Sequence, residues 1–213
     1  MRYFWTTLAI LCAITAIIFL FFVFSVQVKN SITFTDDTAI TTPLITIADP
    51  SVGPADAPVT IVDYGDYACP ACSRVDSALQ DLSATYKDKL RIVWKDMPNS
   101  SAHPEAINAA VAARCAGKQN KFWEYHNMLM GNQTALGADL YTQIATSLGL
   151  KESAFSRCAT NQETLALVER GFEEGAALGI TATPTLFING ERYSGNMTTA
   201  DLGKRIEAII AGL

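Results

Sequence analysis

Length, composition and charge narrow the classes of protein to which the sequence belongs. The 213 residues suffice for one substantial domain and an appendage, because single cores usually comprise roughly 100 to 200 residues. With 16 Lys and Arg and a net charge of −5, the chain offers few cations for neutralising phosphates. Nucleic acid is therefore excluded as an expected partner.

The first segment, residues 1–28, is predicted to be a single transmembrane helix. The stretch from Tyr3 to Val28 carries no charged side chain, and its densest part reads LAILCAITAIIFLFFVF. About 20 apolar residues cross a hydrocarbon core of about 30 Å. A cleaved secretory signal is the alternative, but the apolar stretch is longer than usual and FSVQVKNS has no A-x-A-like cleavage site. A retained anchor is the favoured interpretation.

The charges on either side of this span predict its orientation. Arg2 precedes the span, whereas Lys29 and then Asp36 and Asp37 follow it. This mild asymmetry favours an N-terminus inside and the rest of the chain outside. We therefore expect a single-pass protein of the cytoplasmic membrane whose catalytic domain faces the periplasm or the cell exterior, where disulfides persist.

Residues 29–53 are predicted to be an extracytoplasmic linker. The stretch TFTDDTAITTPLITIADPSVG is rich in Thr, Asp and Pro and shows no sustained period, which is typical of connecting segments. The next run, APVTIVDYGDY, contains mostly β-prone residues. It indicates a strand that is buried in a sheet.

A helix is predicted after this strand, and a second strand after the helix. Cys72, Val75 and Leu79 recur at steps of three and four, which is the period of a helix with one buried face. Pro70 suits the first turn, because the N–H that it lacks would have no acceptor within the helix. The run LRIVWKDMP then predicts a strand that Pro98 ends.

The middle of the chain, about residues 103–178, is predicted to be a block of helices. Apolar residues recur there at helical spacing, and Gly179 suits a left-handed C-cap. TLFINGERYS then places Asn-Gly between two β-prone runs, the strongest short hairpin signal, and TTADLGKRIEAIIAGL predicts a closing helix. The order of these elements indicates an α/β domain over residues 54–213, with both faces of its sheet covered.

Cys69 and Cys72 are two thiols at C-x-x-C spacing, which suits a metal half-site, a structural bridge or a redox couple. Structural zinc takes four N or S ligands, usually in two spaced pairs. Neither Cys115 nor Cys158 has another Cys or a His within four residues. Cys69 stands at the start of the predicted helix, where free N–H groups and the helix dipole lower the pKa of a thiol. A redox couple is favoured, with Cys69 as the thiolate nucleophile and leaving group.

Three other titratable residues invite a functional reading. Asp63 lies in the predicted central strand, where a carboxylate is costly without a partner or a task, so we expect it to accept the proton of Cys72. Alternatively the strand ends early and Asp63 is solvated. His103 and His126 have no spacing that indicates a metal site or a triad. They are expected at the surface or in capping positions.

The segments VTIVDYGDYACPACSRV, FWEYHNML and ALGITATPTLFING together carry a family resemblance. They resemble the DsbA-like thiol-disulfide oxidoreductases, a branch of the thioredoxin superfamily with a helical insertion. The similarity runs from about Pro54 to the C-terminus. It is specific because C-P-x-C before a helix is combined with T-P-T before a hairpin. It implies a thioredoxin-like fold with an inserted helical domain.

The resemblance also implies roles for individual residues. Cys69 forms a mixed disulfide with a substrate protein and Cys72 resolves it. The Thr183–Pro184 peptide bond is cis and faces the two cysteines, so that the backbone of Thr183 is available to a substrate strand, as in β-addition. Asp63 matches the family's buried acidic position. No metal or organic cofactor is implied, because the dithiol itself carries the electrons.

Cys115 and Cys158 both lie in the predicted helical block. Either they are two inert core thiols, or they form a second disulfide, which some relatives of this shape carry in the insertion. An exported domain favours the disulfide.

The resemblance and the exported context together predict a membrane-anchored enzyme that donates disulfides to exported proteins with free thiols. A quinone-linked membrane partner of the DsbB or VKOR kind is implied for its reoxidation. The family's best-known strong oxidant has Pro-His between its cysteines, whereas this chain has Pro70-Ala71, and Ala71 cannot stabilise a thiolate as His does. A reductase or isomerase of the same fold is an alternative. A non-catalytic, anchored module that binds peptides or acts as a chaperone is another.

Overall fold

The computed structural model describes residues 15–19, 40–194 and 198–212. The chain divides into two compact units, residues 1–39 and residues 40–213. In the first unit only residues 15–19 are described, and they are helical. Within the described ranges no helix has the length and apolar character needed to cross a membrane. Most of the predicted anchor, residues 1–28, lies outside those ranges, so the anchor stays a prediction.

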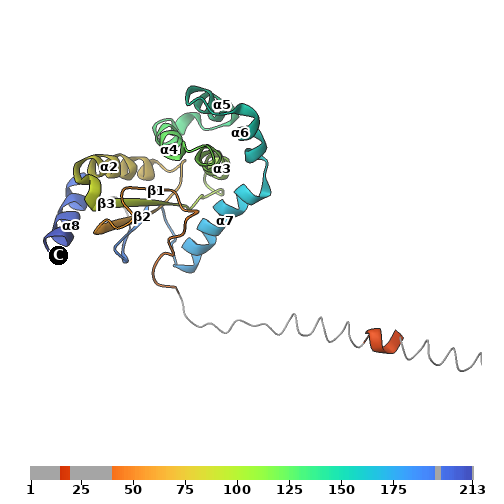
Figure 1. Ribbon diagram of the computed structural model, residues 1–213, viewed down its shortest axis with the longest axis horizontal. Helices are drawn as coiled ribbons and strands as arrows, with labels where there is room; N and C mark the ends of the chain where they lie inside the picture. The colour runs from red at the N-terminus through yellow and green to blue at the C-terminus, as the bar shows by residue number, and fades with distance from the viewer. Residues whose placement is uncertain (1–14, 20–39, 195–197, 213) are drawn as a thin grey trace, which may run out of the picture. The chain divides into compact units, whose positions relative to one another are not determined.

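A five-stranded sheet lies at the centre of the second unit (Figure 1), in the order β1-β3-β2-β4-β5. The pair β2 and β3 at the centre of the sheet is parallel, and every other neighbouring pair is antiparallel. The central pair is rich in Val and Ile because both of its faces are covered. The strands are β1 (Ser51–Val52), β2 (Val59–Gly65), β3 (Leu90–Asp96), β4 (Thr185–Ile188) and β5 (Glu191–Ser194).

Two helices, α2 (Pro70–Tyr86) and α8 (Thr199–Ala211), cover one face of the sheet. Each presents an apolar stripe at helical spacing to the strands. Figure 1 shows the two helices lying next to each other. The main contacts come from Val75, Leu79 and Leu82 of α2, Leu202 and Ile206 of α8, and Ile61, Leu90, Ile92, Leu186 and Ile188 of the strands.

Helix α7 (Gln162–Ala177) passes close to the end of β3 on the opposite side. Its glycines make this approach possible, because a Cβ on Gly171 would lie 2.7 Å from the carbonyl oxygen of Asp96. After α7 the chain buries Leu178 and Ile180 against the second face of the sheet. The approach of α7 matters for the site, because the segment that follows it leads directly to Thr183.

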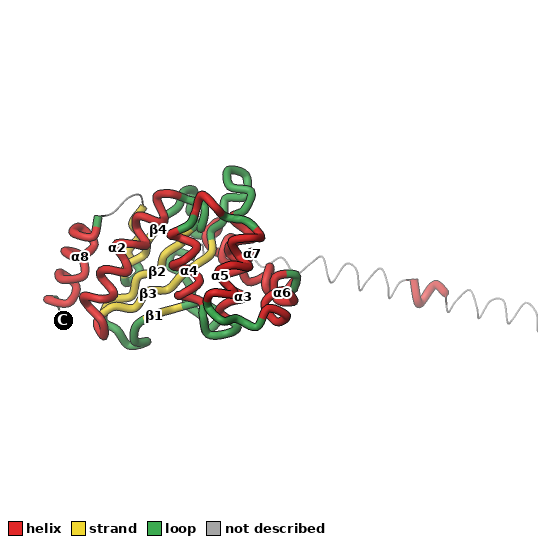
Figure 2. The backbone as a smooth tube through the Cα atoms, turned by 90° about the horizontal axis from the view of Figure 1, so that it is seen from above, coloured by secondary structure: helices red, strands yellow, loops and turns green. Residues whose placement is uncertain are grey.

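Four more helices separate β3 from α7, and Figure 2 shows them gathered beside one end of the sheet. Their shared core is continuous with the start of α2, because Cys69 and Cys72 belong to the same buried cluster as their apolar side chains. The helices are α3 (Ala106–Gly117), α4 (Phe122–Gly131), α5 (Ala138–Ser147) and α6 (Glu152–Ala159). Two short 3₁₀ turns, η1 (Lys87–Lys89) and η2 (Gln133–Ala135), follow α2 and α4.

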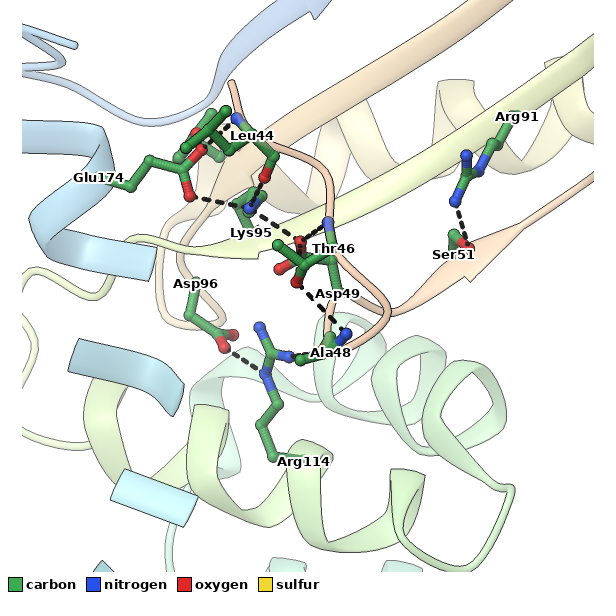
Figure 3. A network of polar contacts seen from close by, with 11 residues as sticks. Leu44, Thr46, Ala48, Asp49, Ser51, Arg91, Lys95, Asp96, Arg114 and Glu174 are labelled. Carbon is green, nitrogen blue, oxygen red and sulfur yellow. Dashed lines mark hydrogen bonds and ion pairs between the residues drawn. The ribbon is translucent and has the colours of Figure 1, made fainter. Parts of the chain in front are cut away.

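The compact unit begins earlier than the sequence suggests. Residues 40–53 were predicted to belong to a linker, but they form part of the second unit, and β1 adds its two residues to the edge of the sheet beside β3. The reason is a set of buried polar contacts (Figure 3). Lys95 of β3 donates from Nζ to the carbonyl oxygen of Leu44 at 2.6 Å and to Asp49 Oδ2 at 3.0 Å.

The same network reaches α7 and α3 (Figure 3). Lys95 Nζ lies 2.8 Å from Glu174 Oε2, and the backbone N–H of Leu44 donates to Glu174 Oε1 at 2.8 Å. A separate ion pair joins Arg114 Nε to Asp96 Oδ2 at 2.6 Å, and Arg114 also donates to the carbonyl oxygen of Ala48. Buried charges are tolerated only when they are paired and hydrogen-bonded. The residues that read as a linker therefore supply partners for charges inside the domain.

Candidate active site

The start of α2 places the two thiols in different environments. Cys69 is the N-cap residue, Pro70 follows in the first turn, and the Cys69 sulfur accepts a hydrogen bond from the backbone N–H of Cys72 at 3.4 Å. Cys69 is 8% exposed, whereas Cys72 is completely buried. Neither is part of a disulfide. The outer sulfur thus meets the amide end of the helix, and the inner one faces the core.

This placement separates the acidities of the two thiols. The hydrogen bond from the Cys72 thiol, together with the N–H groups at the helix start, lowers the pKa of Cys69 to about 5. The same thiol–thiolate hydrogen bond, and then burial, raise the pKa of Cys72. The two shifts describe one shared proton, which stays on Cys72 while Cys69 is the anion. The pair is therefore arranged with a reactive outer sulfur and a protonated inner one.

The Thr183–Pro184 peptide bond is cis and lies against the outer thiol. The Cys69 sulfur is 3.5 Å from the carbonyl oxygen of Thr183, to which the thiol donates when it is protonated. A cavity of about 290 Å³ opens next to this loop. Its walls come from the segment after β3, from α7 and from the segment before Pro184, and they include Met97, Pro98, Ser100, Phe172, Ile180 and Thr183.

Asp63 lies on β2, paired in register with Trp94 of β3, and is 1% exposed. Its Oδ1 has no hydrogen-bond partner within the described part of the chain. Burial raises the pKa of Asp63 well above its usual range, and the charges of Asp76 and Cys69 raise it further. Burial thus favours the protonated form of this carboxyl group, and its negative charge, when present, raises the pKa of Cys72.

The expectation that His126 lies at the surface is wrong, because its side chain is completely buried in α4. Its Nε2 lies 2.9 Å from Asp76 Oδ1, and its Nδ1 lies 2.9 Å from the hydroxyl of Tyr67. The spacing of His126 from its apolar neighbours in the sequence could have indicated this burial. His126 comes four residues after Phe122 and three before Leu129, which places all three on one side of the helix.

The other histidine, His103, contacts the loop in front of the thiols. Its Nδ1 lies 2.8 Å from Oδ2 of Asp66, which also accepts the backbone N–H of Asn99 at 3.0 Å. Asp66 Oδ1 accepts the N–H of Ala68 at 2.8 Å, so the buried carboxylate fixes the turn that leads to Cys69. Asp66 was not among the site residues predicted from the sequence.

Cys115 of α3 and Cys158 of α6 form a disulfide, the second of the two arrangements considered from the sequence. Their Cα atoms are 5.6 Å apart, and the bond joins two helices of the insertion. Among the described residues no group of three or more His, Cys, Asp or Glu side chains is placed to hold a metal ion.

Comparisons with known proteins agree with this geometry. The family model described as thioredoxin matches residues 46–208. A thioredoxin-like oxidoreductase from Silicibacter pomeroyi DSS-3 has 24% identity and a TM-score of 0.70 over 78% of this chain and 94% of that chain. Wolbachia pipientis alpha-DsbA1 has 20% identity and a TM-score of 0.70 over 80% and 94% of the two chains. Both structures show likeness in fold.

A curated relative adds similarity in sequence over part of its length. A Na(+)/H(+) antiporter NhaA 1 of Mycolicibacterium gilvum is 38% identical over 159 residues, which are 73% of this chain and 26% of that protein. The chain thus spans about a quarter of the length of this relative. The family match, the cis-proline loop and the inserted helices lead to one conclusion: the chain belongs to the thioredoxin family and has the fold of the DsbA-like thiol-disulfide oxidoreductases.

Proposed function

We propose that this DsbA-like thiol-disulfide oxidoreductase works in the oxidising direction and donates a Cys69–Cys72 disulfide to exported proteins. The observation that carries the proposal is the position of Cys69 at the N-cap of α2, where its sulfur accepts the Cys72 N–H at 3.4 Å and its pKa is lowered to about 5. A thiolate that is stable in the reduced enzyme makes the disulfide easier to reduce, and it also makes Cys69 a good leaving group. Both properties suit a donor of disulfides.

The proposed reaction consists of two exchanges. A client thiolate attacks the Cys69 sulfur, a bond forms between the two sulfurs, the Cys69–Cys72 bond breaks, and Cys72 takes up a proton. A second client thiolate then attacks the client sulfur of the mixed disulfide, and Cys69 leaves as the thiolate. The client loses two electrons and the enzyme gains them. Asp63, buried and protonated, supplies the proton that Cys72 takes up, and it recovers a proton when the pair is reoxidised.

The substrate in this proposal is an extended segment of the client that carries a Cys. The Thr183 carbonyl lies beside the Cys69 sulfur, so a client strand can hydrogen-bond to the backbone there, as in β-addition. The cavity beside Thr183 supports an apolar neighbour of that Cys, because Met97 and Ile180 line it and Phe172 is 44% exposed at its edge.

The proposed location and partners depend on the sequence before residue 40. The uncharged stretch from Tyr3 to Val28 supports a single anchor in the cytoplasmic membrane, with the domain in the periplasm or outside the cell. In this arrangement the reduced pair would pass its electrons to a quinone-linked membrane protein of the DsbB or VKOR kind.

The reduction potential of the purified chain tests the direction. Equilibration against a glutathione series should give a potential closer to about −120 mV, the value of the strong oxidant of this family, than to about −270 mV, that of thioredoxin. A value near −250 mV would instead indicate a reductase or an isomerase.

Replacement of the two thiols tests the catalytic roles. In a Cys72→Ala chain Cys69 can still attack a client disulfide and form a mixed disulfide, but no Cys72 thiol is present to release the client, so these adducts should accumulate. Cys69→Ser should abolish turnover. A Cys69→Ser chain that still performs its function would indicate a module that only binds peptides or acts as a chaperone.

A further inference from the structure

A side chain of the helical insertion holds the backbone of the active-site loop. Gln133, half-buried in η2, donates from Nε2 to the carbonyl oxygen of Tyr67 at 2.8 Å and to the carbonyl oxygen of Cys69 at 2.9 Å. A second contact lies beside it, where Ser73 Oγ donates to the carbonyl oxygen of Met130 at 3.0 Å. The end of α4 and the start of α2 are therefore joined at the reactive cysteine.

The carbonyl oxygen of Cys69 has several donors. Besides Gln133 it accepts the N–H of Cys72 at 3.0 Å and the N–H of Ser73 at 3.3 Å. The N–H of Cys72 also lies 3.4 Å from the Cys69 sulfur, so this one donor is shared between the carbonyl oxygen and the sulfur. Any group that satisfies the carbonyl leaves the Cys72 N–H freer to bind the sulfur.

The hydrogen bond from Gln133 to the Cys69 carbonyl should matter most in the reduced enzyme, in which Cys69 is a thiolate. A thiolate is a strong hydrogen-bond acceptor, because charge-assisted hydrogen bonds are about twice as strong as neutral ones. The sulfur of a disulfide carries no charge, so the direction of the Cys72 N–H has little effect in the oxidised enzyme. A change at Gln133 should thus alter the balance between the two redox states as well as the stability of both.

We propose that Gln133 is a positioning residue that strengthens the hydrogen bond from the Cys72 N–H to the Cys69 thiolate by holding the Cys69 carbonyl. The inference rests on the proposed function of the pair. It assigns the helical insertion a direct part in setting the redox potential. Gln133 is uncharged, and its replacement removes none of the groups that shift the pKa of Cys69, which are Cys72, Ala71 and Thr183. It also leaves in place the carboxyl group of Asp63, with which the charge of Cys69 interacts.

Gln133→Met in the full chain, purified in detergent, tests the inference, because Met has a similar length and no N–H donor. Gln133→Ala is the second variant, and Thr134→Ala, at an exposed residue of the same turn, is the matched control. The measurements are the pKa of Cys69 from the thiolate ultraviolet absorbance, the potential against glutathione, and the thermal unfolding midpoint of each redox form.

The expected result for Gln133→Met is a thiolate population about tenfold lower below the pKa, which is a rise of about one pKa unit. The potential should become more negative by about 30 mV, equivalent to a tenfold change in the exchange constant. Thr134→Ala should match the unsubstituted chain. Equal pKa and potential in Gln133→Met and the unsubstituted chain would overturn the inference, even if both Gln133 variants unfolded at a lower temperature.

These measurements also separate this inference from the proposed function. A reducing potential in the unsubstituted chain would refute the proposed direction, but the difference between that chain and Gln133→Met would still be measured. That difference alone decides the role of Gln133.

Discussion

Asp76 and His126 form a hydrogen-bonded pair, with 2.9 Å between Oδ1 and Nε2, one helical turn along α2 from Cys72. The His126 ring lies among Tyr67, Trp94 and Trp123, with ring centroids about 5 Å apart. Asp63 and Asp76 are two buried acidic groups whose charges interact, and Asp76 has the imidazole of His126 as its partner. His126 of α4 thus contacts the carboxyl group of Asp76, whose charge raises the pKa of Asp63.

The first prediction concerns Asp76→Asn. Because the charge of Asp76 helps to raise the pKa of Asp63, the substitution should lower the pKa of Asp63 toward its ordinary value. The amide can retain a hydrogen bond to His126, so the fold should persist. The measurement is the carboxyl signal of Asp63 in infrared spectra recorded across pH. Asp81→Asn, at an exposed position of α2, is the control and should leave that signal unchanged. An unaltered Asp63 titration in Asp76→Asn would show that the two carboxyls do not interact.

The second prediction is a pH dependence that belongs to Cys69. Its pKa is lowered to about 5, whereas an unfolded thiol titrates near about 8.5. The reduced native state therefore binds fewer protons than the unfolded state between these values, and its free energy of unfolding should rise from pH 5 toward pH 8. This contribution is lost as the pH falls through about 5. Urea unfolding of the reduced form at several pH values measures it.

The oxidised form provides the control for this pH dependence, because a disulfide sulfur does not titrate. Cys72, whose pKa is raised in the folded state, affects the free energy of unfolding only when the pH approaches the pKa of an ordinary thiol. Alkylation of Cys69 by iodoacetamide should accordingly reach half its maximal rate near pH 5. A half-maximal rate near pH 8.5 would mean that the helix start does not stabilise the thiolate.

The third prediction concerns the Cys115–Cys158 disulfide. The cysteines are 43 residues apart, so in the chain-entropy model their bond stabilises the fold by about 4 kcal/mol. Replacing both by Ala should lower the free energy of unfolding by about this amount without changing the potential of Cys69 and Cys72. With Cys69 and Cys72 already reduced in both chains, reduction of the Cys115–Cys158 bond should destabilise the unsubstituted chain, and further reductant should leave the double variant unaffected. Alkylation without reductant, followed by mass spectrometry, would contradict the bond if both sulfurs were labelled.

The fourth prediction compares two truncated chains. A chain that begins at Pro54 lacks the carbonyl of Leu44 and the carboxylate of Asp49, which both bind Lys95. Removing one partner of a buried ion pair typically costs about 3 to 5 kcal/mol, so this chain should be less stable by at least about 3 kcal/mol than one that begins at Ile40. Denaturant unfolding of both measures the difference. Equal stabilities would mean that residues 40–53 contribute nothing to the fold.

Local patterns were sufficient to predict the elements that build the active site. The helical period from Cys72 onward and Pro70 before it place α2, and the Asn189-Gly190 turn places the β4–β5 hairpin. The cis bond before Pro184 has no local signal of comparable strength. It was expected only from the family resemblance, because the surrounding fold and not the dipeptide selects the isomer.

Long-range polar pairs could not be predicted in the same way. Lys95 meets Asp49 and Glu174, which are 46 and 79 residues away, and His126 meets Asp76 at a distance of 50 residues. Each of these side chains is charged or polar, so composition alone assigns it to solvent. Only the packing of β3, α4 and α7 brings the partners together, and their pairing then offsets the cost of burying them. The predicted linker was therefore too long, and His126 was misplaced.

The attachment of Leu44 has a mechanical consequence. Both its N–H and its carbonyl oxygen are bound, to Glu174 and to Lys95, ahead of the edge strand β1. A force that pulls on the chain before residue 44 would act first on these two hydrogen bonds of Leu44. They would transmit the force to β3 and α7 before β1 could separate from β3. A domain pulled from its N-terminal side should therefore resist unfolding until the hydrogen bonds of Leu44 to Glu174 and Lys95 break.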